Sequence, residues 1–301
     1  MDQMSMNGYE LLDFGGGRRL ERFGPWIIDR PCPAAEPFAP AEAALWRQAH
    51  ARFERDVKKS DASGKSDVSG ESGRWTTVES LPERWTIGPE PFHLELKLSP
   101  FGHLGVFAEQ ADNWRWIADR VARADRPLAV LNLFGYTGAS TLAAAAAGAA
   151  EVVHVDAAHN TIRWARRNAE ISGLADAPIR WIAEDASKFV RRELKRGNAY
   201  DAVILDPPSY GHGRRGEVWR LSKHLAWLLA DCAALTAGRR SFMLLTAHTP
   251  EYDEGRLAAM LAEALGETDE AGGRLSARAM SIRGADGREL PSGSAARWSV
   301  G

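Results

Sequence analysis

From residue 128 onward, short apolar runs alternate with longer stretches that have helical periodicity. The runs have the length and composition of β-strands and lie at 128–134, 151–156, 179–184, 200–206 and 241–247. Between them, helical patterns occupy 139–147, 160–172, 187–196 and 218–235. The run from Ala202 to Leu205 is apolar at every position, which is typical of a strand covered by helices on both faces. The alternation therefore predicts an α/β fold with an open, doubly wound and mostly parallel sheet.

The C-terminal residues extend this predicted sheet. Another helical pattern lies at 254–265, and two β-like segments follow it at 274–282 and 295–300. We expect these two segments to be antiparallel to each other and to close the sheet, which then has seven strands.

The first 95 residues differ in composition from the rest. Prolines, glycines and short aromatic runs predict small strands near 23–28, 74–78, 84–87 and 92–98. Apolar residues at helical spacing predict one helix at 40–56, and a stretch rich in Ser, Gly, Asp and Lys predicts a mobile loop at 58–73. We therefore expect a small β-rich domain at 1–95 and a larger α/β domain at 96–301.

Charge and cysteine content exclude several classes of protein. The chain has 38 Lys and Arg against 40 Asp and Glu, and both are divided evenly along it, so neither half is a polycationic arm that binds phosphate backbones non-specifically. The only cysteines, Cys32 and Cys232, lack a CxxC spacing and cannot form a disulfide framework or a cysteine-rich zinc site.

The N-terminus does not resemble a secretory signal, and the most apolar stretch, 142–150, is too short to span a bilayer. We expect a cytoplasmic protein that does not associate with membranes.

Ligands of such sheets bind beyond the carboxyl ends of the strands, so the residues that follow each strand are the candidates for a site. After the first strand, Gly135 and Gly138 allow a tight turn and a close approach of the backbone to a ligand, although an ordinary strand-to-helix turn has the same residues. Asp156 ends the second strand, 21 residues after Gly135, where a carboxylate can bind ribose hydroxyls or cap the next helix. Asp185 follows the third strand and can accept a bond from an adenine amino group or act as a cap. Together these positions indicate a nucleoside cleft.

The fourth strand ends in Asp206-Pro207-Pro208-Ser209-Tyr210. Prolines cannot extend a β-ladder, so they expose neighbouring carbonyl groups at the cleft, although a double proline can also merely end a strand. Asp206 and a proline carbonyl can accept both protons of a planar amino group, and Tyr210 can stack on its ring.

These motifs resemble those of class I S-adenosylmethionine-dependent methyltransferases, close to the bacterial 23S ribosomal RNA large-subunit methyltransferases. The resemblance runs from about residue 93 to the C-terminus and includes 132–138, Asp156, Asp185 and 206–210. The segment 105–110 also resembles the family's Gly-aromatic-x-x-Asp-Gln segment, which lies over the cofactor. The resemblance implies a Rossmann-like fold, methyltransferase activity, and S-adenosylmethionine as the cofactor, with no requirement for a metal.

The resemblance also implies roles for individual residues. Gly135, Thr137 and Gly138 would surround the methionine part of the cofactor, Asp156 its ribose and Asp185 its adenine edge. The same motifs contribute the other candidate cofactor contacts, Phe107, Gln110, Asn132, Phe134 and Ala186. The candidate catalytic residues are Asp206, Pro207, Pro208 and Tyr210.

One departure from the family narrows the reaction. Members that methylate C5 of cytosine have a cysteine nucleophile at the end of the fifth strand, whereas this chain has 245–249, Leu-Thr-Ala-His-Thr. We therefore expect methylation of a nitrogen, most simply of an amino group held by Asp206, with a ring nitrogen as the alternative. His248 in this segment is a candidate proton acceptor, or a residue that merely ends the strand.

The leading hypothesis is an enzyme that methylates a nucleobase nitrogen in ribosomal RNA. Candidate RNA contacts are Ser209 and His248 near the loop, Arg214 and Arg215 just past it, and Arg18, Arg19 and Arg22 in the N-terminal domain. A methyltransferase acting on a protein or small molecule is one alternative, and a non-catalytic RNA-binding or assembly factor that retains the cofactor cleft is another. A nicotinamide oxidoreductase is disfavoured because Gly-x-Gly-x-x-Gly is absent. The sequence predicts no particular oligomeric state.

Overall fold

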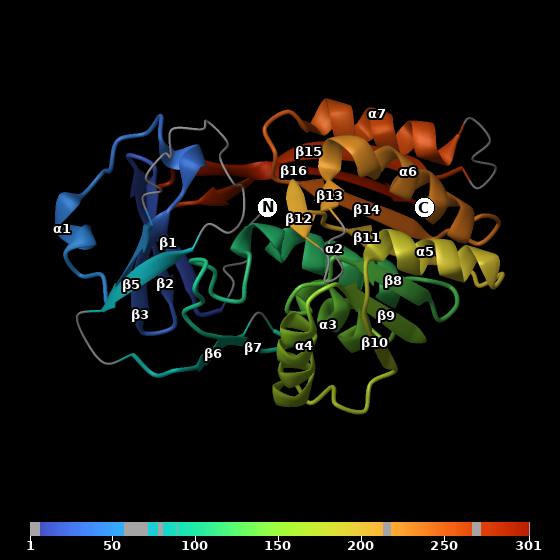
Figure 1. The fold of residues 1–301 in the computed structure, drawn as a ribbon, viewed down its shortest axis with the longest axis horizontal. Coiled ribbons are helices and arrows are strands. Elements are labelled where there is room, and N and C mark those ends of the chain that lie inside the picture. Colours follow the sequence, from blue (N-terminus) through green and yellow to red (C-terminus); the bar gives the residue numbers. More distant parts are fainter. Residues whose placement is uncertain are drawn as a thin grey trace. The chain divides into compact units, whose positions relative to one another are not determined.

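The computed structural model describes residues 7–56, 72–77, 81–88, 90–212, 218–266 and 272–300. They divide into two compact units (Figure 1). The first comprises Met1–Glu90, Leu94–Ala108 and Ser281–Pro291, and the second comprises Pro91–His93, Glu109–Met280 and Ser292–Gly301. Both strands of the C-terminal hairpin thus contribute residues to each unit. The predicted division between residues 95 and 96 stays a prediction.

A seven-stranded sheet forms the centre of the second unit, in the order β10-β9-β8-β11-β14-β16-β15. The first five strands in this order pair in parallel, and β16 pairs antiparallel with β14. Their bounds are β8 Ala129–Leu133, β9 Glu151–Asp156, β10 Ile179–Ala183, β11 Ala202–Leu205, β14 Phe242–Ala247, β15 Arg274–Arg283 and β16 Glu289–Ser299. The predicted fold class, a doubly wound and mostly parallel α/β sheet, is confirmed.

Six α-helices pack against the faces of this sheet. Their bounds are α2 Ala111–Ala122, α3 Ala139–Ala146, α4 His159–Ile171, α5 Ala186–Lys195, α6 Leu221–Leu235 and α7 Glu254–Leu265. Leu131 and Leu133 of β8 belong to the core cluster that includes α5, α6 and α7, while Asn132 between them hydrogen-bonds to Thr141 of α3. Alternate residues of a strand point to opposite faces, so α3 lies on the face opposite α5, α6 and α7.

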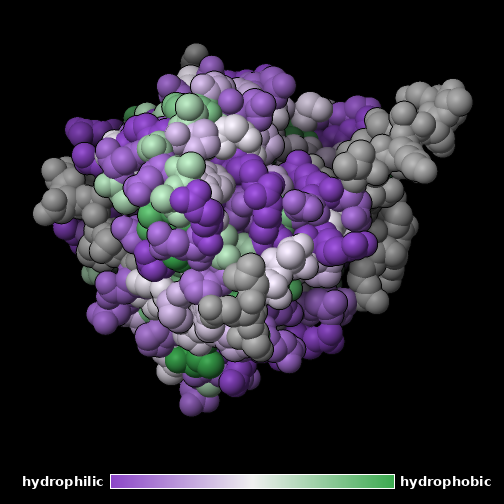
Figure 2. Space-filling model, turned by 90° about the vertical axis from the view of Figure 1, so that its left-hand side faces the viewer, coloured by the Kyte–Doolittle hydropathy of each residue, from purple (hydrophilic) through white to green (hydrophobic). Residues whose placement is uncertain are grey.

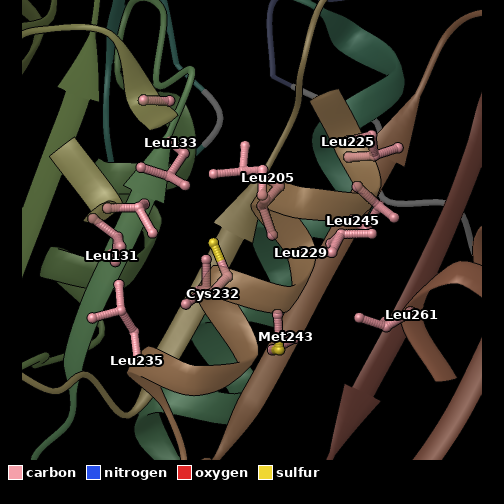
Figure 3. Close-up of a cluster of buried hydrophobic side chains, with 14 of the residues drawn as sticks. Leu131, Leu133, Leu205, Leu225, Leu229, Cys232, Leu235, Met243, Leu245 and Leu261 are labelled. Carbon is pink, nitrogen blue, oxygen red and sulfur yellow. The ribbon is translucent and has the colours of Figure 1, made fainter. Parts of the chain in front are cut away.

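The core on the α5 to α7 side is built from leucine, valine and methionine side chains of strands and helices. Figure 3 shows side chains from β8, β11 and β14 meeting those of α6, among them Cys232 and Met243. These side chains are fully buried and supply the apolar contact area that holds the helices on the sheet. The all-apolar run that identifies β11 in the sequence is therefore explained by burial on both faces.

The first unit contains a five-stranded sheet in the order β1-β2-β3-β4-β5. The strands are β1 Tyr9–Gly15, β2 Arg18–Phe23, β3 Trp26–Pro31, β4 Ala51–Arg55 and β5 Gly73–Thr77. A two-stranded ladder, β6 Trp85–Ile87 with β7 Leu94–Leu96, also lies in this unit. The short helices are η1 Pro33–Ala35 and α1 Ala43–Trp46, and η2 Ala108–Gln110 precedes α2 in the chain.

The predicted helix at 40–56 is wrong. Only α1 is helical there, and 51–55 form strand β4, which pairs with β3 and β5. Ala51 and Phe53 are buried while Arg52 and Glu54 are exposed, which is the two-residue period of a strand. The helical spacing in the sequence arose because Leu45, Trp46 and Ala49 pack on a separate small cluster in the same unit.

One smaller prediction is modified in its bounds, and another falls mostly outside the described residues. The predicted helix at 218–235 begins at Leu221, because Val218–Arg220 forms strand β13 and pairs with β12, Tyr210–His212. The predicted loop at 58–73 lies outside the described residues, except for Ser72 and Gly73.

The surface is mixed in character. On the face drawn in Figure 2, hydrophilic residues prevail and hydrophobic ones form small separate groups. Throughout the described part of the chain, every helix is too short or too polar to cross a membrane.

Candidate active site at the carboxyl edge of the sheet

Four polar or strained segments meet at one edge of the seven-stranded sheet. Phe134 follows β8, Asp156 ends β9, Asp185 follows β10 and Asp206 follows β11. These strands are adjacent and parallel, so their carboxyl ends lie at the same edge. This is the position at which ligands bind in open α/β sheets.

The loop between β8 and α3 has a strained backbone. Phe134 and Tyr136 have φ angles of 57° and 49°, in the left-handed region that side chains rarely adopt, and Gly138 has a φ of 93°. Gly138 N donates to Gly135 O at 2.9 Å, and Asn168 of α4 donates to Thr137 O at 2.8 Å. Strain of this kind persists only where surrounding contacts hold it, and it is frequent in loops that bind ligands.

Glycine is required at position 135 because a buried side chain next to it leaves no room for a Cβ atom. A Cβ atom at this position would lie 2.4 Å from Cε1 of His154, a buried residue of β9. Nδ1 of His154 lies 2.8 Å from Thr141 Oγ1, which also accepts a hydrogen bond from Asn132. Burial lowers the pKa of His154 to about 3, so its ring is neutral. Asn132, a predicted cofactor contact, therefore lies in a buried polar chain beneath the loop.

Asp156 links the ends of two strands to the loop. Its carboxylate accepts hydrogen bonds from Tyr136 N at 3.0 Å and Ala158 N at 2.9 Å, while its carbonyl accepts from Glu184 N at 3.0 Å. Burial raises the pKa of Asp156 and outweighs the two backbone hydrogen bonds. The residue at the N-cap of α4 is Ala158, so Asp156 is not the helix cap that the sequence left as an alternative.

Asp185 does cap the helix that follows it. Its Oδ1 accepts a hydrogen bond from Lys188 N at 2.9 Å, which satisfies one of the free N–H groups at the start of α5. Ala186 is the first residue of that helix and is buried. The cap fixes the position of the carboxylate at the sheet edge, one strand away from Asp156.

Asp206 is the centre of a hydrogen-bonded network. Oδ1 accepts from Thr246 Oγ1 at 2.5 Å and lies 3.2 Å from His248 Nε2. Oδ2 accepts from Gln110 Nε2 at 3.1 Å, and the Gln110 carbonyl accepts from Asn113 Nδ2 at 2.5 Å. Gln110, which the sequence predicts as a cofactor contact, thus contacts Asp206.

The charges in this network stabilise one another. Burial raises the pKa of Asp206, but the His248 cation and the three hydrogen bonds outweigh it and hold the pKa below its usual range. Burial lowers the pKa of His248, but Asp206 and then Glu109, 4.0 Å away, raise it to about 9. At neutral pH the imidazole is therefore protonated, which favours a role as hydrogen-bond donor over the predicted role as proton acceptor.

The proline loop after Asp206 is held by side chains from β13 and from the segment after β14. Trp219 Nε1 donates to Pro208 O at 2.7 Å, and Ser209 Oγ lies 2.5 Å from Thr249 Oγ1. The Trp219 ring also packs on Phe134, with centroids 4.9 Å apart. Tyr210 begins β12 and faces the Arg220 guanidinium, whose Cζ atom lies 6.0 Å from the ring centroid.

Several predicted residues lie elsewhere. Phe107 belongs to the first unit, where its ring packs on His103 with centroids 5.5 Å apart. Arg214 and Arg215 lie outside the described residues. The arginines predicted as RNA contacts in the first unit are engaged by carboxylates: Arg18 with Asp29, Arg19 with Glu21 and Arg22 with Glu10.

Sequence reasoning did not assign roles to Thr246, Asn113, His154 or Trp219. The signal for Thr246 was present, because β11 and β14 were both recognised and their parallel pairing places Leu245 beside Leu205. Asn113 follows Gln110 by three residues, a spacing that brings side chains together on a helix, so this contact could also have been predicted from the sequence. The contact of Trp219 with Pro208 follows from the β12–β13 ladder, which the sequence did not indicate.

Comparison with known proteins places this chain in a family. The family described as S-adenosylmethionine-dependent methyltransferase matches residues 64–240. Ribosomal RNA large subunit methyltransferase I of Aeromonas hydrophila is 36% identical over 114 residues, which are 38% of this chain and 28% of that protein. Ribosomal RNA large subunit methyltransferase K of Neisseria meningitidis serogroup B is 24% identical over 205 residues, 67% of this chain and 52% of that protein. The chain thus matches about half or less of the length of these curated relatives.

A solved structure matches the chain over nearly its full length. It is a SAM-dependent methyltransferase from Agrobacterium tumefaciens, 37% identical, with a TM-score of 0.88, and it covers 99% of this chain and 92% of that one. The methyltransferase SMU.776, solved in complex with SAH, is 16% identical with a TM-score of 0.73 and covers 97% of this chain and 75% of that one. The second likeness concerns the fold alone.

Proposed function

Since the chain belongs to the S-adenosylmethionine-dependent methyltransferase family, we propose that it methylates a nucleobase nitrogen in ribosomal RNA. The observation that carries the proposal is the hydrogen-bonded network in which Gln110, Thr246 and His248 hold the partly buried Asp206 carboxylate at the sheet edge. An acceptor group held there would lie beside the strained loop after β8. We further propose that residues 96–301 form the methyltransferase domain and that the small β-rich domain at 1–95 helps to dock the RNA.

The residues at the edge fit S-adenosylmethionine, which supplies a methyl group on a sulfonium that is already activated for transfer. Carboxylates accept several hydrogen bonds and donate none, so Asp156 suits the ribose hydroxyls and Asp185 the adenine amino group. Backbone N–H groups fix the Asp156 carboxylate on the loop itself, which favours its use as a ligand-binding group. Gly135, Thr137 and Gly138 would surround the methionine part, with Phe134 and Ala186 flanking the nucleoside.

Asp206 would orient the acceptor amino group. Its carboxylate is kept anionic by its neighbours and can accept one amino proton in a further hydrogen bond. The carbonyl of Pro207 would accept the other proton, because the Pro208 carbonyl already accepts from Trp219. Two fixed acceptors set the plane of the amino group and leave the nitrogen lone pair open to methylation, while Tyr210 would stack on the base.

A nitrogen acceptor also agrees with the position of the cysteines. Thr246 hydrogen-bonds to Asp206 at the end of β14, in the segment where C5-methylating relatives have their nucleophile. Cys232 is fully buried in α6, and burial raises the pKa of its thiol, which opposes formation of a reactive thiolate. Cys32 lies in the first unit, and burial raises its thiol pKa as well.

The choice of ribosomal RNA rests on the curated relatives, which are named ribosomal RNA large subunit methyltransferases. Such a substrate places the protein in the cytoplasm. The test is mass spectrometry of the ribosomal RNA nucleosides from a deletion strain, followed by incubation of that RNA with purified protein and labelled S-adenosylmethionine.

We expect one methylated nucleoside to be missing in the deletion strain and restored by the purified protein. A strain that carries the Asp206→Ala protein should lack the same nucleoside, which separates methyl transfer from a role in assembly. An unchanged nucleoside profile would reject ribosomal RNA as the substrate. Restoration by Asp206→Ala would reject the role of that carboxylate.

A further inference from the structure

A groove of about 450 Å³ lies between α5 and α6, and its lining does not include the residues of the Asp206 network. The two helices pack side by side in the second unit (Figure 1). Residues of both helices and of β13 line it: Asp185, Ser187, Lys188, Arg191, Val218, Trp219, Lys223, His224, Trp227, Leu228 and Asp231. Of these, Asp185 and Trp219 also border the candidate active site.

The groove exposes apolar surface that a folded protein normally buries. Among the described residues, three large hydrophobic side chains are exposed: Phe101, Val218 and Trp227. Val218 and Trp227 both line this groove, and the Trp227 side chain is 72% exposed. In the same lining, the Trp219 ring stacks on His224 with an interplanar angle of 29°. An indole this accessible offers a flat face to a planar ligand.

Three basic side chains line the same groove as the exposed indole. Lys223 precedes Trp227 by one helical turn and therefore lies on the same face of α6, while Lys188 and Arg191 come from α5. Both acidic side chains of the lining interact locally, since Asp185 caps α5 and Asp231 lies 3.7 Å from Arg191. The lining has three basic side chains against two carboxylates, so the groove combines an aromatic platform with a small excess of positive charge.

We infer that this groove binds a single-stranded segment of RNA, with a base stacked on Trp227 and phosphates beside Lys188 and Lys223. The inference rests on the proposed function and identifies where its substrate docks. Aromatic platforms flanked by cations are the usual means of binding single strands without reading their sequence. The cores of protein interfaces are depleted in lysine, so the same lining fits a second copy of the chain less well.

The position of the groove suits this role. Trp219 lines it and at the same time holds the Pro208 carbonyl, so RNA in the groove would lie next to the loop that carries Asp206. A strand anchored on Trp227 could therefore be continuous with a base presented to the active site. Docking energy gained there would help to position that base.

The test is the affinity of the full-length protein for a fluorescein-labelled 12-nucleotide RNA of mixed sequence, followed by fluorescence anisotropy. Loss of one stacked base costs ~1–3 kcal/mol, so Trp227→Ala should weaken binding roughly 5- to 140-fold. Trp227→Phe should retain most of the affinity. Lys223→Gln should lower the slope of log affinity against log salt by about 0.7, the contribution of one phosphate contact.

Matched controls lie outside the groove. Phe101→Ala removes another exposed aromatic side chain, and Lys195→Gln removes another exposed lysine at the end of α5. Neither should change RNA affinity by more than about twofold. S-adenosylmethionine affinity, measured by calorimetry, should be the same in Trp227→Ala and wild type, which shows that the variant is folded.

Wild-type affinity in Trp227→Ala would overturn the inference, as would a failure of the wild-type protein to bind the RNA. A copy-to-copy interface would replace it if Trp227→Ala changed the sedimentation coefficient and left RNA affinity unchanged. The binding assay requires no methyl transfer, so these results are separate from those that test the proposed function. The deletion strain could lack a methylated ribosomal nucleoside while Trp227→Ala still binds RNA as the wild type does. That combination would reject the groove as the RNA-binding site and leave the proposed function intact.

Discussion

His248 and Asp206 form an ion pair, with Nε2 of the imidazole 3.2 Å from Oδ1 of the carboxylate. The other ring nitrogen, Nδ1, lies 2.8 Å from the carbonyl oxygen of Ser292. Both nitrogens face acceptors, and an imidazole can donate from both only when it is protonated. The geometry and the raised pKa of His248 therefore agree on a cation that holds the Asp206 carboxylate in place.

The ion pair predicts a specific pH dependence of stability. Since the pKa of His248 is about 9 in the folded protein and its usual value is 6.5, its contribution is fully present below about pH 6.5 and is lost as the pH rises through about 9. The difference in Tm between wild type and His248→Gln should therefore be largest near pH 6.5 and shrink by pH 9.5. Thermal melts at half-unit pH steps measure this.

His159→Gln is the matched control, because it removes an exposed histidine from the same unit. NMR titration of the His248 ring gives a second readout. A midpoint near 6.5 would show that the ion pair does not form in solution.

Asp206→Asn should reduce methyl transfer by at least about 100-fold, because misplacement of a reacting group has effects of this size. Asparagine is nearly isosteric, but it lacks the negative charge that pairs with His248 and orients the acceptor. The affinity for S-adenosylmethionine should change by less than about threefold, since the carboxylate is proposed to contact the acceptor. Calorimetry and single-turnover kinetics measure the two quantities, with Asp125→Asn as a control at an exposed carboxylate.

Asp156→Ala should weaken binding of S-adenosylmethionine roughly 10- to 100-fold, because a hydrogen bond to a charged group contributes about 1.5–3 kcal/mol. The substitution also frees the N–H groups of Tyr136 and Ala158. Asp176→Ala, at an exposed position of the same unit, is the control. Undiminished affinity in Asp156→Ala would remove this residue from the cofactor site.

Asp185 has a structural role as a helix cap, and a pair of substitutions separates it from the proposed contact with adenine. Asp185→Ala removes both and should destabilise the protein by about 1 kcal/mol. Asp185→Ser preserves a capping oxygen, so stability should be close to that of the wild type. If Asp185→Ser nevertheless loses affinity for S-adenosylmethionine, the carboxylate contacts the cofactor. If Asp185→Ser binds S-adenosylmethionine as tightly as the wild type, the only role of Asp185 is to cap the helix.

Gly135→Ala should destabilise the protein by about 1–3 kcal/mol, the usual cost of overpacking a core, because the new Cβ meets the His154 ring. In a His154→Ala background the same substitution should cost much less, since the ring that it meets is gone. A double-mutant cycle from denaturant unfolding gives the coupling between the two positions. Additive effects would mean that the glycine is needed for another reason.

Much of the second unit followed from sequence alone. A strand buried on both faces is mostly apolar, so the runs that became β8, β9, β11 and β14 were recognisable without any knowledge of their neighbours. The parallel order then required Asp156, Asp185 and Asp206 to share one edge. In the first unit, β4 is only five residues long, so its two-residue period is a weak signal. It follows shortly after the residues of α1, whose helical spacing led to the wrong prediction of one helix over both segments.

The tertiary structure decided which partners those carboxylates have. Gln110 reaches Asp206 from 96 positions away and His248 from 42, and no local pattern encodes such distances. No local pattern encodes the role of His154 either. This residue of β9 leaves no room for a Cβ atom at Gly135, which follows the neighbouring strand β8. Sequence determined the strands and the edge because backbone pairing and burial leave a periodic pattern in neighbouring residues. Charge state and side-chain contacts depend on groups brought together only by folding, so the structure alone determined them.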